Sequence, residues 1–114
     1  MKLITQEIEK KLEKAPLYST EDIKNPEIIV KFFTPDSNWT WYAVEGTKTG
    51  DGDWEFFGLV DGQDKELGYF MLSELQKVRG NLGLPVERDM YFDGRKLDKM
   101  NLEVLDESKT PAAK

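Results

Sequence analysis

The chain has 114 residues and a formal net charge of −6, and it contains neither histidine nor cysteine. This length fits one domain, which can bury enough surface to form a core without a metal ion or a disulfide. The missing imidazole and thiol groups exclude a Ser-His-Asp triad, a thiolate nucleophile and the common zinc sites.

A short amphipathic helix is predicted near the start of the chain. Thr5 has the side chain of a helix cap, and the helix is expected to end at about Lys14 because Pro16 follows. Apolar residues recur every fourth position and form one stripe, Ile4, Ile8 and Leu12. Charged residues recur from Glu7 onward and no apolar run precedes them, so this segment is not expected to be a signal peptide. The absence of cysteine favours a reducing compartment, and we expect a cytoplasmic protein without a membrane span.

The middle of the chain predicts four strands. Segments rich in β-branched and aromatic residues are separated by turns that contain proline, glycine or aspartate. These segments are residues 28–33, 37–45, 54–60 and 66–72. Short connections between consecutive strands favour an antiparallel meander.

A second helix and a fifth strand are predicted after the meander. Ser73 and Gln76 stand at capping-box spacing, and Gly80 suits the end of that helix. Residues 86–92 alternate as a strand does. The sequence therefore predicts one α+β domain over residues 1–105, with a sheet of about five strands and two helices. Residues 106–114 have no apolar period and are expected to be disordered.

An aromatic cluster lies in the second predicted strand. Alternation places Trp39 and Trp41 on one face of the sheet and Tyr42 on the other. Trp41 is predicted to be a core residue because both faces of this strand are apolar. Trp39 lies next to a turn, where either a core edge or a binding rim fits an indole that keeps its N–H near water.

Acidic residues are concentrated between Asp36 and Gln76. This stretch has nine acids against two bases, and its net charge of −7 argues against binding to a phosphate backbone. Two readings remain, namely solvated turn residues and a surface that imitates nucleic acid.

The alternating acids Asp51, Asp53 and Glu55 resemble part of a calcium loop. The match fails further on, because Phe56 stands where the loop needs a glycine and Gly62 stands where it needs a bidentate acid. We therefore expect no metal and no cofactor.

A charged cluster in the fifth predicted strand offers a site for carboxylate chemistry. Glu87 and Asp89 would share one strand face, roughly 6–7 Å apart, and Glu66 could join them. Arg88 would face the core and need a partner such as Glu66 or Glu74. A structural ion pair and a carboxylate-based hydrolase are the two alternatives for this cluster.

Four blocks in this order are similar to one small bacterial family, catalogued as domain of unknown function 2958. The blocks are "VKFFTPDSNWTWYAVE", "FFGLVDG", "ELGYFMLSEL" and "GLPVERDMYF". The resemblance covers roughly residues 3–95. It implies an accessory role on a plasmid, phage or conjugative element, and it implies no catalytic activity.

Together these features favour a non-catalytic protein that binds a protein partner. The expected surface joins aromatic anchors with acidic hairpin ends, which would attract a basic or DNA-binding partner. Its residues are Trp39, Tyr42, Asp36, Asp51, Asp53 and Asp61. The alternatives are a nucleic-acid mimic that inhibits a DNA-binding enzyme, and an enzyme that uses Glu66, Glu87 and Asp89.

Overall fold

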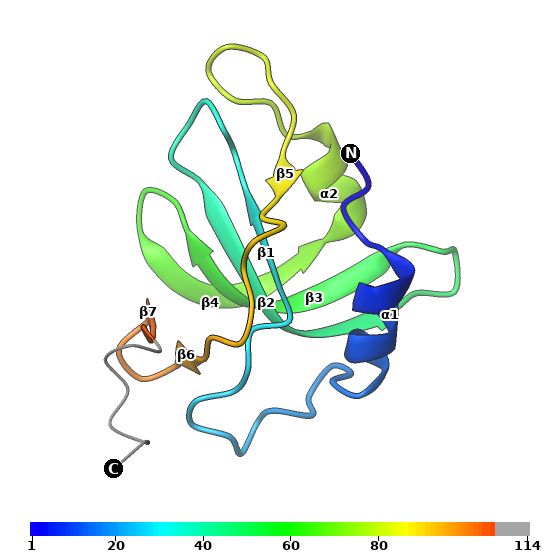
Figure 1. The fold of residues 1–114 in the computed structure, drawn as a ribbon, viewed down its shortest axis with the longest axis vertical. Helices are drawn as coiled ribbons and strands as arrows, with labels where there is room; N and C mark the ends of the chain where they lie inside the picture. Colours follow the sequence, from blue (N-terminus) through cyan, green and yellow to red (C-terminus); the bar gives the residue numbers. More distant parts are fainter. Residues whose placement is uncertain (107–114) are drawn as a thin grey trace.

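An antiparallel five-stranded sheet forms the centre of the protein in the computed structural model, which describes residues 1–106 (Figure 1). The strands are β1 (Val30–Phe33), β2 (Thr40–Lys48), β3 (Trp54–Asp61), β4 (Lys65–Met71) and β5 (Glu87–Arg88). Their order in the sheet is β4-β3-β2-β1-β5. The predicted α+β class and the meander of the first four strands are confirmed.

The N-terminal helix α1 (Gln6–Glu13) forms as its sequence predicts. The Thr5 hydroxyl accepts a hydrogen bond from the Ile8 N–H at 3.2 Å, and the helix ends one residue before Lys14. Ile4 and Leu12 are buried in the core, and Ile8 packs against it. Packing of this stripe stabilises a helix that is too short to be stable alone.

The second helix, α2 (Leu72–Lys77), begins two residues earlier than predicted. Its N-cap is Met71 rather than Ser73, and the Glu74 carboxylate accepts a hydrogen bond from the Met71 N–H at 2.8 Å. The predicted exit at Gly80 was also wrong, because extended backbone begins at Val78. The helix begins earlier than predicted because Glu74, rather than Gln76, is the residue whose side chain accepts the N–H of the N-cap residue.

The two faces of the sheet have separate apolar cores. Both helices cover the first face, where Trp41 and Phe56 meet Leu12 from α1 and Leu75 from α2. In Figure 1 the helices lie together on the right, whereas the orange C-terminal segment lies apart from them. Residues from the second half of the chain cover the second face, where Leu97 packs on buried side chains of the strands.

A short hairpin near the C-terminal end completes the second face. It consists of β6 (Leu97–Asp98) and β7 (Glu103–Val104), which the sequence did not predict. The Asp98 carboxylate accepts hydrogen bonds from the backbone of Met100 and Asn101 and so closes its turn.

The predicted disordered tail lies outside the described residues except for Asp106. No helix within residues 1–106 is long and apolar enough to cross a membrane.

The fifth strand is much shorter than predicted. Only Glu87 and Arg88 pair with β1, whereas residues 86–92 were expected to form a strand. The chain turns immediately afterwards, because the Asp89 carboxylate accepts the Tyr91 N–H at 3.0 Å. Met90 and Tyr91 are consequently exposed, so the alternation in this segment does not reflect burial.

A β-bulge in β2 changes which residues face which core. Ala43 pairs with Gly58, but the next register pair joins Glu45 to Phe57, so Val44 is the extra residue. Gly58 permits this geometry, since a Cβ atom there would overlap the Tyr42 carbonyl oxygen. Val44 and Glu45 therefore both lie on the second face.

Candidate binding surface

The aromatic platform of this protein is a stacked pair of indoles at one end of the sheet. Trp41 is 7% exposed and lies in the first core, whereas Trp39 is 40% exposed. Their ring centroids are 6.0 Å apart with an interplanar angle of 25°. The β1–β2 turn holds Trp39 in place, because the backbone N–H of Trp39 donates to the Thr34 hydroxyl at 3.0 Å. Trp39 is thus a rim residue that rests on a core residue.

Gly62, in the β3–β4 turn, lies against the Trp39 ring. A Cβ atom at Gly62 would overlap that ring, so only glycine leaves room for it. Thr40 pairs with Asp61, which places the acidic β3–β4 turn directly beside the indole. This contact joins two of the predicted surface residues, Trp39 and Asp61.

Asp36 has a structural role in the same region. Its carboxylate oxygen Oδ2 accepts the N–H groups of Leu82 (2.7 Å) and Leu84 (3.1 Å), while the Ser37 hydroxyl accepts that of Asn81 at 3.0 Å. The loop of residues 80–84 is therefore fixed against the β1–β2 turn, and its two leucines are exposed. In Figure 1 this loop and the β1–β2 and β3–β4 turns lie at the same upper-left end of the molecule.

Asp51 and Asp53 lie at the opposite end of the sheet, in the β2–β3 turn. The Thr49 hydroxyl donates to Asp51 and lowers the pKa of its carboxyl group. Asp53 accepts the Ser73 N–H at 3.1 Å and the Trp54 N–H at 2.7 Å. The main cause of its lowered pKa is the hydrogen bond from the Ser73 side chain, followed by the bond from the Trp54 N–H. Asp53 thus links the turn to α2. Residues 1–106 contain no cluster of three or more acidic side chains placed to hold a metal ion.

Tyr42 lies on the second face, away from Trp39. Its ring packs on Phe92 at 6.1 Å between centroids, and the Lys31 ammonium lies 5.8 Å from its centroid. Burial raises the pKa of its phenol, with a further contribution from Asp61. The structure thus divides the predicted surface: Trp39, Asp36 and Asp61 share one end, and the other three residues lie elsewhere.

The carboxylates of the alternative catalytic site do not converge. Glu66 is on β4 at one edge of the sheet, whereas Glu87 is on β5 at the opposite edge, with three strands between them. Glu87 lines a pocket beside the N-terminal segment and α2, and Glu66 is not among the residues that line it.

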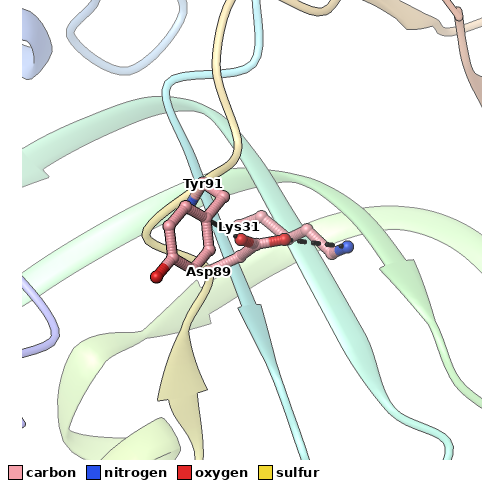
Figure 2. Close-up of polar contacts among 3 residues, drawn as sticks. All are labelled: Lys31, Asp89 and Tyr91. Carbon is pink, nitrogen blue, oxygen red and sulfur yellow. Dashed lines mark hydrogen bonds and ion pairs between the residues drawn. The ribbon is translucent and has the colours of Figure 1, made fainter.

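Arg88 and Asp89 take part in structural contacts instead. The Arg88 guanidinium donates to the Lys2 carbonyl, so neither of its expected partners, Glu66 and Glu74, is bound. Figure 2 shows Asp89 in an ion pair with Lys31 at 3.3 Å while it accepts the Tyr91 N–H. These contacts fasten the N-terminal segment and the turn after β5 to the sheet.

Sequence reasoning missed Glu45, which is the most buried carboxylate among the described residues, at 2% exposed. Its oxygen Oε1 accepts the Tyr18 N–H at 2.7 Å, and Oε2 accepts both the N–H (2.8 Å) and the hydroxyl of Thr20. Its position on the second face results from the bulge at Val44. Its place directly after the apolar residues 41–44, within a predicted strand, is the signal in the sequence that distinguishes it from the turn acids.

One family model matches the chain, over residues 3–103, and its description is "Protein of unknown function (DUF2958)". No curated protein and no solved structure matches. The match spans both cores, every strand except the end of β7, and the Trp39 region. The chain therefore belongs to this family of unknown function.

Proposed function

We propose that this protein is a non-catalytic binding module that docks a basic segment of a protein partner on the Trp39 end of the sheet. The observation that carries the proposal is the half-exposed Trp39 ring stacked on buried Trp41. A rigid aromatic side chain supported by the core is typical of residues that dominate binding energy. The 80–84 loop adds the exposed side chains of Leu82 and Leu84.

Charge beside this apolar surface supports a basic partner. The two turns that flank Trp39, residues 34–39 and 61–66, carry four acids against Lys65, a net charge of −3. Acids at the rim of an apolar centre increase the association rate of a positively charged partner and disfavour acidic ones. The accessory role on a mobile element that the family resemblance implies favours a partner that serves plasmid or phage maintenance.

The nucleic-acid mimic is the second candidate, and the same acids motivate it. A mimic would bind chiefly through its charges, so its affinity would fall steeply with salt. A module anchored by Trp39 would keep most of its affinity, because apolar burial is not screened.

Affinity capture with three matched chains tests the proposal. The wild-type chain, Trp39→Ala and Tyr91→Ala would be immobilised, and bacterial extracts passed over each. Tyr91 is 92% exposed and lies away from the Trp39 end, so it controls for the loss of any exposed ring. We expect proteins retained by the wild-type chain and by Tyr91→Ala to be absent from Trp39→Ala.

Titration of a captured partner with salt then separates the two candidates. Retention that persists at high salt supports the aromatic anchor, and loss at moderate salt supports mimicry. Equal retention by Trp39→Ala and the wild-type chain would contradict the proposed site.

A further inference from the structure

A cleft on the face of the sheet opposite α1 and α2 combines three aromatic rings with a buried carboxylate. It has a volume of about 490 Å³ and is lined by Tyr18, Phe57, Tyr69 and Glu45, among others. Tyr69 pairs with Phe57, and Phe57 pairs with Glu45, so these three form one row across β4, β3 and β2. The volume lies in the range of small-molecule and side-chain sites.

The rings form the wall of this cleft. Phe57 and Tyr69 have centroids 4.9 Å apart at an angle of 50°, and Tyr18 and Tyr69 are 6.3 Å apart at 54°. Rings tilted at such angles leave part of each ring face uncovered, whereas rings in a parallel stack cover one another. Tyr69 is 51% exposed, so much of its ring surface lies open to a ligand.

Tyr18 is held in a strained backbone conformation. Its φ angle is +74°, a left-handed value that is unusual for a bulky residue. The hydrogen bond from its N–H to Glu45 maintains this conformation and holds the ring beside Tyr69. Such strain persists only where surrounding contacts determine it, and it is concentrated at ligand sites.

The charge of the cleft is negative. Glu21, Asp22 and Glu45 line it together with one base, Lys99, which leaves a net charge of −2. The Lys99 ammonium donates to the carbonyls of Thr20 (2.7 Å) and Glu21 (3.4 Å), so its hydrogen bonds are directed to the backbone. Partial desolvation, followed by the proximity of Tyr18 and Glu45, raises the pKa of the Tyr69 phenol, as expected in a negative environment.

We propose that this cleft binds an alkylated ammonium group, with the Tyr18, Phe57 and Tyr69 rings as its walls and Glu45 as its fixed negative charge. The faces of aromatic rings carry negative potential and attract such cations, which are weakly hydrated and lose little on leaving water. This site is separate from the Trp39 end and does not depend on the proposed partner. The group can come from a small compound or from a methylated lysine of a protein.

NMR titration of the full chain with choline tests the proposal, because its neutral isostere 3,3-dimethylbutan-1-ol has the same shape without the charge. We expect choline to shift the amide signals of Phe57 and Tyr69, and the isostere to bind at least about tenfold more weakly. Equal binding of the two probes, shifts confined to other regions, or no binding of choline would each overturn the proposal.

Variants and a second probe complete the test. Tyr69→Ala should weaken choline binding at least about tenfold, whereas Tyr69→Phe, which keeps the ring, and Tyr91→Ala, a ring outside the cleft, should bind as the wild-type chain does. Unchanged binding by Tyr69→Ala, in a protein whose spectrum shows an intact fold, would also overturn it. A trimethyllysine peptide that binds more tightly than choline identifies a protein side chain as the source of the group, and the reverse order identifies a small compound.

Discussion

Glu45 pairs directly with Phe57 across β2 and β3, although an unbroken register would pair Glu45 with Phe56. One extra residue at Val44 moves this acid from the helix-covered core to the second face. There it accepts three hydrogen bonds from Tyr18 and Thr20 and fixes the connector between α1 and β1.

Replacement of Glu45 by alanine is expected to destabilise the fold. The change removes the acceptor of three hydrogen bonds, two of them from the buried Thr20, and a buried donor without a partner costs about 1–3 kcal/mol. We expect a loss of roughly 3 kcal/mol or more in the free energy of unfolding, measured in urea. The control Glu66→Ala, at an exposed site, should stay within about 0.5 kcal/mol of wild type. Similar values for both variants would show that the Glu45 contacts contribute little.

Two paired glycines give a matched test of the bulge. Gly58→Ala should destabilise the protein strongly, because its Cβ would overlap the Tyr42 carbonyl oxygen, which belongs to backbone that cannot rotate away. Gly68 lies opposite Gly58 on β4 and has open space at its Cβ position, so Gly68→Ala should be neutral or slightly stabilising. Melting temperatures of both variants check this difference, and a Gly58→Ala protein that melts like wild type would refute it.

The two stacked indoles are expected to differ in their contribution to stability. Trp41→Ala removes a buried ring and should cost about 3–5 kcal/mol. Trp39→Ala should cost about 0.5–1.5 kcal/mol, the value of a lost aromatic pair. Urea denaturation of both variants measures the difference. A Trp41→Ala protein with unchanged stability would show that this residue is not part of the core.

Stability is expected to fall in acid, and Asp53 should account for part of the loss. A hydrogen bond from the Ser73 side chain lowers the folded pKa of Asp53 below the unfolded value of about 4. The stabilisation is therefore complete above that unfolded value and disappears as the pH falls through the folded pKa. Free energies of unfolding measured between neutral and acidic pH should decrease less for Asp53→Asn than for wild type. Asp64→Asn is the control, and an identical pH profile for Asp53→Asn and wild type would contradict this role.

Asp36 is expected to hold the loop of residues 80–84 in place. In Asp36→Ala the N–H groups of Leu82 and Leu84 lose their acceptor, so their hydrogen exchange should accelerate markedly. Exchange of core amides such as that of Phe56 should change little, which separates local opening from global unfolding. Unchanged exchange at both leucines would show that other contacts fix the loop.

The sequence alone determined the four-stranded meander and the place of Trp41 in the main core. Alternation around Trp41 correctly placed Trp41 and Tyr42 on opposite faces of the sheet, because a two-residue period is a local property of the strand. The Thr5 cap and the Ile4, Ile8 and Leu12 stripe likewise predicted α1, since a cap and a helical face need only neighbouring residues.

Only the tertiary structure decided which residues meet around each candidate site. Asp36 was predicted as a surface acid, but it binds a loop more than forty residues away, and Asp53 binds α2 twenty residues away. Glu45 and Tyr18 approach each other because the bulge shifts the register by one residue. Such contacts depend on long-range pairing and on a single extra residue, and neither leaves a periodic signal in the local sequence.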